Sequence, residues 1–341
     1  MANINEQTSS MADFITKLDA FLTTNGWTQD RLVTGSGEWA ISKAAVSDTV
    51  RLAAQWDTGT PGNLGLYQYL GAYNIGLAPY AQADDSGNGA QSTSNATLGT
   101  ARHVPLGSTP IQYWAFEEDH YFHVVVESSS GQFRHFGAGQ LSKFGDWTGG
   151  TYVYGQRIAG TSTSQVGLQL VDTSLLDGIA MDGINPTTND MELYVATLHC
   201  EGLPGQVASG KYAVHMGNQA SGNLGNDRQS TPIARSHFVG GHRGGPWARV
   251  LSRFEGSDLS GHLPMYPIGS MYWRRGNSDA YGPMGVMKDV RGVSIRDYVG
   301  GQELTIGGDT WVIFPVRTKW SGSGAHTSTT DYQGIAYKKI P

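Results

Sequence analysis

The chain has 341 residues, and 15% of them are charged, whereas about a quarter of the residues in a typical soluble domain carry charge. The formal net charge of −6 offers no basic stripe for duplex DNA, so the composition argues against sequence-specific nucleic-acid binding. Cys200 is the single cysteine, so no intrachain disulfide can form and folding in a reducing cytoplasm is expected.

The opening stretch, MANINEQTSSMADF, has neither a basic region nor an apolar region of the kind that begins a secretory leader. It therefore predicts no signal peptide. No apolar run in the chain reaches the roughly 18 residues that a membrane-spanning helix needs. We expect no membrane partner.

The stretch SSMADFITKLDAFLTTNGW (residues 9–27) predicts an amphipathic helix. Four apolar residues fall at the spacing i, i+4, i+7 and i+8, which places them on one helix face: Phe14, Leu18, Phe21 and Leu22. Ser10 is a suitable N-cap, and Asp13 stands three residues later in the capping-box position. Gly26 provides the left-handed stop, and Trp27 is expected to pack just beyond it.

After this helix the pattern changes to short apolar or alternating runs bounded by Gly, Asn, Asp and Pro, which is typical of strands. The expected strands are 50–55, 64–73, 112–116, 122–127, 132–137, 151–156, 193–198, 233–239, 271–275, 311–316 and 334–338. Strands without intervening helices predict a mainly β fold. We expect a β-sandwich or barrel-like sheets with long loops and one N-terminal amphipathic helix.

Three connections, residues 80–99, 216–232 and 319–331, are long and polar. Loops longer than about fifteen residues are uncommon in compact domains and are often functional or ordered by a partner. We therefore expect neighbouring protein chains to order them.

The polar stretch AGTSTSQ (residues 159–165) is the best boundary between domains. The expected organisation has three parts. Residues 1–30 form a helical docking segment, residues 31–160 a β-rich domain, and residues 161–341 a second β-rich domain.

The stretch that most resembles a chemical site runs from residue 115 to 147 and gathers carboxylates and imidazoles: Glu117, Glu118, Asp119, His120, His123 and His135. On a strand, His120 and His123 point to opposite faces, whereas a zinc site needs three or four ligands that converge at about 2 Å. We therefore expect residues 117–120 to form a solvated turn, and His123 and His135 to pair across neighbouring strands. Neither a metal nor another cofactor is predicted.

Other catalytic patterns are weak. The chain has no G-x-S-x-G, phosphate-loop or H-E-x-x-H motif. His199 and Cys200 are adjacent on an expected strand, so their side chains point to opposite faces and form no dyad. A glycosidase acid and base would have to come from four carboxylates: Asp172, Asp177, Asp182 and Asp190.

Two aromatic clusters, LYQYLGAYN and SMYWRRGNSDAYGPM, have a composition found at protein interfaces, and exposed aromatic rings also suit sugar binding. Burial in the core is the third interpretation. The residues proposed for contacts between subunits are Phe14, Leu18, Phe21, Tyr67, Tyr69, Tyr272, Trp273, Arg274 and Tyr281.

Several segments resemble structural proteins of tailed-bacteriophage particles: FITKLDAFLTTNGWT, FHVVVESSSGQFRHFGAGQLSKFGDWTGGTYVYGQ, WVIFPVRTKW and DYQGIAYKKI. The resemblance covers about a quarter of the chain and carries no catalytic residue. It implies a component of the tail, baseplate or head–tail junction, folded and assembled in the host cytoplasm.

The leading interpretation is therefore a non-enzymatic virion subunit that contacts copies of itself and other virion proteins. Rings with closed symmetry are the usual form of such assemblies. The alternatives are a receptor- or glycan-binding tail module and a cell-wall glycosidase.

Overall fold

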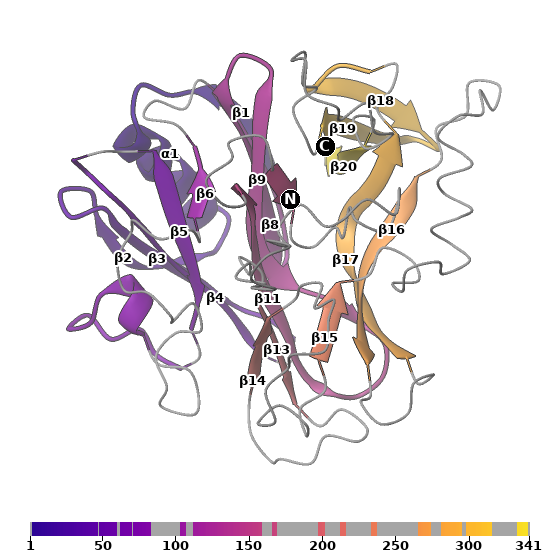
Figure 1. Ribbon diagram of the computed structural model, residues 1–341, viewed down its shortest axis with the longest axis horizontal. Helices are drawn as coiled ribbons and strands as arrows, with labels where there is room; N and C mark the ends of the chain where they lie inside the picture. Colours follow the sequence, from indigo (N-terminus) through magenta and orange to yellow (C-terminus); the bar gives the residue numbers. More distant parts are fainter. Residues whose placement is uncertain are drawn as a thin grey trace, which may run out of the picture.

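The computed structural model describes residues 2–46, 48–59, 62–69, 71–82, 103–106, 112–158, 166–168, 197–201, 212–215, 233–236, 265–273, 281–294, 298–315 and 333–339. Within these ranges the chain is mainly β, with one α-helix near the N-terminus and a short 3-10 turn, η1 (Pro79–Ala81). The predicted fold class is confirmed. The strands form three antiparallel sheets, seen side by side in Figure 1.

The central sheet contains, in spatial order, β1 (Ala2–Gln7), β7 (Gln112–Glu118), β8 (Tyr121–Ser129), β9 (Gln132–Gln140), β11 (Thr148–Ile158), β13 (Thr197–Glu201) and β14 (Tyr212–His215), with β12 (Val166–Leu168) paired to β11. The N-terminal sheet contains β2 (Thr28–Val33), β3 (Glu38–Ala44), β4 (Thr49–Trp56), β5 (Asn63–Gln68) and β6 (His103–Pro105).

The C-terminal sheet contains β15 (Ile233–Ser236), β16 (Tyr266–Trp273), β17 (Tyr281–Ser294), β20 (Gln333–Lys339), β19 (Asp309–Pro315) and β18 (Gln302–Ile306), with β10 (Ser142–Lys143) paired to β17. In both outer sheets and in the central one, neighbouring strands run antiparallel.

Helix α1 (Met11–Thr24) begins and ends where the sequence predicts. The Ser10 side chain accepts a hydrogen bond from the Asp13 backbone N–H at 3.0 Å, and the Ser9 N–H reaches the Asp13 carboxylate at 2.8 Å. Gly26 adopts φ +84°, the left-handed conformation that ends the helix, and Trp27 is buried directly after it.

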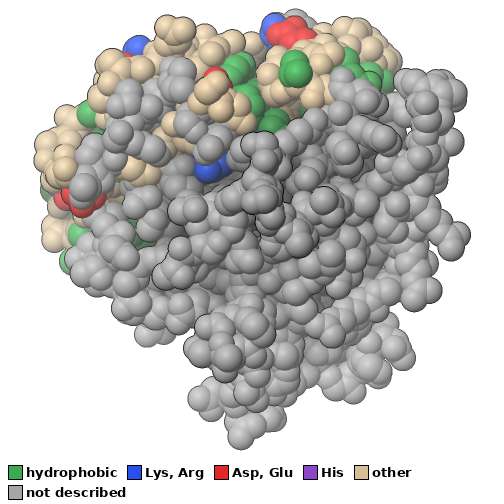
Figure 2. Space-filling model, turned by 45° about the horizontal axis from the view of Figure 1, so that its top comes forward, with side chains coloured by type: hydrophobic (Ala, Val, Ile, Leu, Met, Phe, Trp, Pro, Cys, Tyr) green, Lys and Arg blue, Asp and Glu red, His purple; other side chains and the backbone are tan. Residues whose placement is uncertain are grey.

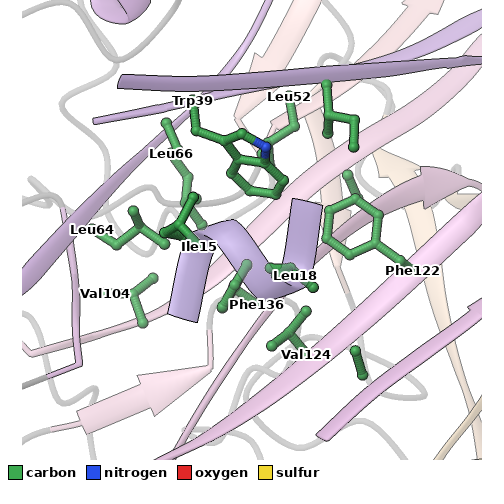
Figure 3. Close-up of a cluster of buried hydrophobic side chains, with 14 of the residues drawn as sticks. Ile15, Leu18, Trp39, Leu52, Leu64, Leu66, Val104, Phe122, Val124 and Phe136 are labelled. Atoms are coloured by element: carbon green, nitrogen blue, oxygen red, sulfur yellow. The ribbon is translucent and has the colours of Figure 1, made fainter. Parts of the chain in front are cut away.

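The main hydrophobic core lies between the N-terminal sheet, α1 and one face of the central sheet. Figure 3 shows Ile15 and Leu18 of α1 between Trp39 of the N-terminal sheet and Phe136 of the central sheet. Even-numbered residues of β8 and β9, such as Phe122, project into this core because side chains alternate along a strand. We call this the apolar face of the central sheet.

The opposite face of the central sheet packs against the C-terminal sheet. Phe116 stacks on Tyr337 with ring centroids 5.2 Å apart, and Trp114 meets Phe314 at 5.0 Å. We call this the polar face, because buried imidazoles, hydroxyls and a carboxyl group stand among its aromatic rings.

The expected division into 1–30, 31–160 and 161–341 does not follow the sheets. The N-terminal segment supplies both a strand of the central sheet and a helix of its core. The central sheet continues across residue 160, from β11 to β13, while β10 joins the C-terminal sheet. Across the described ranges, no helix is long and apolar enough to cross a membrane.

Candidate functional site

The polar face is built on two glycines that make room for two tyrosines. In β9, Gly137 and Gly139 stand opposite Tyr154 and Tyr152 of β11. A Cβ on Gly137 would lie 2.8 Å from the Tyr154 ring, and one on Gly139 would lie 2.8 Å from the Tyr152 hydroxyl oxygen. The two tyrosine side chains therefore occupy the space over the glycines, which a larger residue would fill.

Tyr337 of β20 is the centre of the contact between the two sheets. Its ring stacks on Phe116 of β7 and on His135 of β9, with centroids 5.2 and 5.9 Å away. The His123 ring of β8 lies 5.5 Å away, and Phe314 of β19 lies 6.2 Å away. One residue of the C-terminal sheet thus contacts three consecutive strands of the central sheet.

The polar atoms around Tyr337 form one hydrogen-bonded chain. Nε2 of His135 lies 2.9 Å from the Pro315 carbonyl oxygen, and its Nδ1 lies 2.8 Å from the Tyr337 hydroxyl. The Tyr337 hydroxyl also interacts with that of Tyr154, which lies 2.9 Å from Nδ1 of His123.

The Pro315 carbonyl sets the direction of this chain, because a carbonyl oxygen only accepts. Nε2 of a neutral His135 therefore carries its hydrogen, and Nδ1 accepts from Tyr337. Tyr337 in turn accepts from Tyr154, and Tyr154 accepts from Nδ1–H of His123. This order places the hydrogen of a neutral His123 on Nδ1 and leaves Nε2 without one.

Both histidines are held neutral by burial. Loss of water lowers the pKa of His123 to about 3, against which Asp289 and the Lys288 backbone act only weakly. Burial likewise lowers the pKa of His135 to about 4, opposed by the Pro315 carbonyl and assisted by the charge of Arg134. Burial also raises the pKa of Tyr154 and of Tyr337.

A carboxyl pair stands at the edge of the same contact. The Tyr121 hydroxyl lies 2.8 Å from Glu118 and 2.7 Å from Asp289 of β17. Burial raises the pKa of Glu118, and the hydrogen bond to Asp289 adds to this rise. Burial acts upward on Asp289 too, but hydrogen bonds from Tyr121 and Glu118, together with Lys338, bring its pKa below the ordinary value. A proton taken up by the pair therefore goes first to Glu118.

The expectation of a solvated turn at residues 117–120 is wrong for its first two members. Glu117 and Glu118 are 2% and 4% exposed. Glu117 lies on the apolar face, where its Oε1 accepts from the Trp27 indole at 3.0 Å and from Lys43 Nζ at 2.6 Å. The turn itself consists of Asp119, with φ +45°, and His120. Glu117 is buried at acceptable cost because it accepts from Trp27 and Lys43, and Glu118 is buried beside the Tyr121 hydroxyl.

The expected pairing of His123 with His135 is also corrected. The register places His123 opposite Gly137, and Val125 opposite His135. The two imidazoles share one face but stand two residues apart, and Tyr337 joins them. Tyr337, Tyr154 and Asp289 are site residues that the sequence analysis missed. The alternation in GAG and YVY, on neighbouring strands, is a signal that predicts tyrosine rings over glycines.

The proposed contact residues of α1 lie inside the molecule. Phe14 and Leu18 are both 0% exposed, so in the folded chain they are core residues, and a docking role for their side chains is incorrect. Sheets cover the helix on both sides, so its apolar side chains pack against other parts of the same chain. Phe21 is half-buried at the edge of this core.

Tyr67 and Tyr69 lie on the outer face of the N-terminal sheet, where Tyr69 is buried over Ala40 and Ala53 and Tyr67 is half-buried. The Tyr69 hydroxyl donates to Asp30 at 2.8 Å, and the Tyr73 ring meets it edge-on at 5.5 Å. This group is called the tyrosine patch.

The remaining proposed residues are placed only in part. In the backbone register of the C-terminal sheet, Trp273 stands opposite Tyr281 and Tyr272 stands opposite Gly282. Arg274 lies outside the described residues. So do the four carboxylates considered for a glycosidase and most of the three long connections.

In the described part of the chain, no group of three or more His, Cys, Asp or Glu side chains is arranged to hold a metal ion. In comparisons with known proteins, neither a family model nor a curated protein matches this chain.

Proposed function

We propose that the protein is a non-enzymatic structural subunit of a bacteriophage particle, in the tail, the baseplate or the neck. Its partners are copies of itself and other virion proteins, and it folds and assembles in the host bacterial cytoplasm. The resemblance of four segments to phage structural proteins and the low content of charged residues support this proposal.

The observation that carries the proposal is the use of the polar face. Three of the groups that the sequence marks as chemical, Glu118, His123 and His135, are buried, and they lie in the contact between the central and C-terminal sheets. Their hydrogen bonds end on protein groups such as Tyr337 and Asp289. Such networks specify a unique arrangement of packed layers, which suits a load-carrying subunit.

The described surface is suited to neutral contacts. In the view of Figure 2, few of the described residues at the surface have charged side chains, and these are scattered. Several apolar side chains project from turns, among them Val46, Ile75 and Val299 at 86, 73 and 71% exposure. Tail and neck subunits that pack through such side chains would bury them on assembly.

Purified particles provide the test. Mass spectrometry should find this chain in virions at a fixed copy number. Phage that encode Val299→Asp should yield fewer complete particles, because the charge opposes burial in a contact. Phage that encode Ser36→Asp, a change in an exposed turn, should assemble normally. Absence of the chain from purified particles contradicts the proposal.

Glycan binding is the second candidate function, and the tyrosine patch favours it. Tyr67 and Tyr73 are half-buried rings, and the Arg31–Glu38 ion pair, in which N and O atoms lie 2.8 Å apart, acts on Tyr73. Rings that flank hydrogen-bonding groups are suited to a sugar face and its hydroxyls.

A glycan array separates this candidate from the first. Binding by the purified chain that is lost in Tyr67→Ala and Tyr73→Ala supports a receptor-binding module. Phe144→Ala, at a ring that is 50% exposed elsewhere on the surface, is the matched control and should bind normally. An array without signal contradicts glycan binding.

A further inference from the structure

We propose that the contact between the central and C-terminal sheets is an acid-sensitive switch: protonation of His123 and His135 separates these two sheets while the apolar core stays folded. This intersheet contact consists of Phe116, His123, His135, Tyr154, Phe314 and Tyr337. The inference does not depend on the proposed function.

A proton added to His135 conflicts with the present order of the hydrogen-bonded chain. Nδ1 of His135 accepts from the Tyr337 hydroxyl, so a proton on Nδ1 would turn this acceptor into a donor. Tyr337 would then have to reverse its hydrogen bond, and Tyr154 and His123 would have to follow. Each of these atoms is buried, so water cannot supply the missing partner.

The groups that face His123 come from both sheets. Tyr121 and Tyr154 face it from the central sheet, and Tyr337 faces it from β20. Asp289 and the Lys288 backbone of β17 favour its charged form, but burial outweighs both. A proton on His123 is therefore unfavourable in the closed contact.

The groups that face His135 give the same result. Tyr337 and the Pro315 carbonyl contact its two nitrogens, while the Phe314 ring lies 6.3 Å away. Arg134, its neighbour on β9, adds a repulsive positive charge. No carboxylate is among the groups that shift the pKa of His135, so its charged form has only the Pro315 carbonyl to favour it.

The sign of the pH effect follows from these pKa values. Both histidines ordinarily titrate near 6.5, and the closed contact lowers their pKa values to about 3 and about 4. When the sheets separate, both histidines return to the ordinary pKa. They then bind protons that they do not bind in the closed contact. Separation becomes more favourable by about fivefold for each histidine between pH 6.5 and 5.5, and the factor approaches about tenfold per pH unit below that.

The carboxyl pair modifies this effect without reversing it. The pKa of Glu118 is raised in the closed contact, so a fall in pH just above 4.5 favours closure through this one group. The pKa of Asp289 is lowered, so its protonation favours separation only below about 3.8. Two histidines act against one carboxyl group, and acid therefore opens the contact.

The apolar core should not respond in the same way. Met11, Leu18, Leu52 and Phe122 belong to a cluster of buried hydrophobic side chains. Asp19 accepts from the Trp39 indole beside this cluster, and burial raises its pKa, so a fall in pH favours the folded core through this group. Separation of the C-terminal sheet is therefore expected before the N-terminal sheet and α1 unfold.

Hydrogen exchange of the full chain at pH 7.5, 6.5, 5.5 and 5.0 tests the inference, after correction for the intrinsic exchange rate. Backbone amides of β19 and β20 should lose protection about thirtyfold between pH 6.5 and 5.5, and those of β3 and β4 should not. Unchanged protection of β19 and β20, or loss of protection in all three sheets together, would falsify the switch.

Substitution identifies the groups responsible. His123→Asn with His135→Gln removes both titrations and retains polar atoms, and it should abolish the difference between pH 6.5 and 5.5. His120→Asn, in the adjacent turn, is the matched control and should leave the difference intact. A pH response that persists in the double variant overturns the inference.

A further variant covers the case in which the double variant does not fold. Tyr337→Phe keeps the ring and both histidines but removes the hydroxyl between them. It should weaken protection of β19 and β20 at pH 7.5 and leave the acid-induced loss in place. Loss of the acid response in Tyr337→Phe, with the histidines present, contradicts the assignment to His123 and His135.

Discussion

The two faces of the central sheet are built from the same strands and differ in what holds them to their neighbours. Phe122, Val124 and Phe136 on the apolar face pack against α1 and the N-terminal sheet. Tyr121, His123 and His135 on the polar face join the C-terminal sheet through hydrogen bonds and stacked rings. Alternate residues of one strand therefore make hydrophobic contacts on one face, which have no preferred direction, and hydrogen bonds on the other, which do.

The two kinds of contact have different physical requirements. Apolar side chains tolerate small shifts, because the hydrophobic effect depends on buried area and not on direction. Buried hydroxyls and imidazoles require one arrangement, since an unmade hydrogen bond costs about 1–3 kcal/mol. The apolar face should set most of the stability, and the polar face should set the position of the C-terminal sheet.

The largest expected effect comes from Phe122→Ala on the apolar face. The Phe122 ring meets Trp27 at 4.9 Å and Trp39 at 6.4 Å, and its removal leaves a cavity. The free energy of unfolding should fall by about 3–5 kcal/mol, measured by chemical denaturation. Protection of all three sheets should fall together, and loss confined to the C-terminal sheet would reverse the assignment of the two faces.

Gly137→Ala tests whether the tyrosine side chains of the polar face require glycine beneath them. The new Cβ would lie 2.4 Å from the Phe122 carbonyl oxygen and 2.8 Å from the Tyr154 ring, so the strand must shift. We expect a loss of about 3 kcal/mol. Gly35→Ala is the control, since no atom lies within 4 Å of its Cβ and its φ is not positive. Equal stability of the two variants would show that the tyrosine side chains do not require glycine at position 137.

Tyr121→Phe isolates one directional contact. The variant keeps the ring and removes the hydroxyl that reaches Glu118 and Asp289. Hydrogen bonds to charged groups are worth more than neutral ones, and a loss of about 2 kcal/mol is expected. Hydrogen exchange should localise the effect to β17 and its neighbours. An equal loss of protection in the N-terminal sheet would contradict the assignment of Tyr121 to the contact with the C-terminal sheet.

The smallest effect is expected for Ser10→Ala at the start of α1. The substitution removes the cap that accepts from the Asp13 N–H at 3.0 Å, which should cost about 1 kcal/mol. Thermal unfolding measures the loss, and Ser10→Asp should restore stability because Asp is also a good cap. If Ser10→Ala loses no stability, packing against the sheets alone determines the first turn of α1.

The predictable part of the fold is the part with a strong local pattern. The helix was predicted with its caps because Ser10, Asp13 and Gly26 act within a few residues of one another. The β7–β8–β9 meander was predicted from alternation and turns. The strand Ala2–Gln7 was not, since Ile4 is its one strongly apolar residue and its pairing with β7 depends on residues more than a hundred positions away.

The candidate site was predictable only in its individual residues. His123 and His135 were recognised as notable, but Tyr337 lies 202 residues from His135 along the chain, and no local pattern links them. Burial of Glu117 was missed because its partner Lys43 is 74 residues away. Three acidic residues in a row predict a solvated turn unless a distant cation is known to meet one of them.

The place of Tyr337 in the chain has a consequence for biosynthesis. It is carried by β20, which follows every other described strand in sequence yet lies between β17 and β19 in space. During translation, the apolar side of the central sheet can therefore form before β20 leaves the ribosome. Until then the rings of Phe116, His123 and His135 lack Tyr337, so this contact with the C-terminal sheet is completed last.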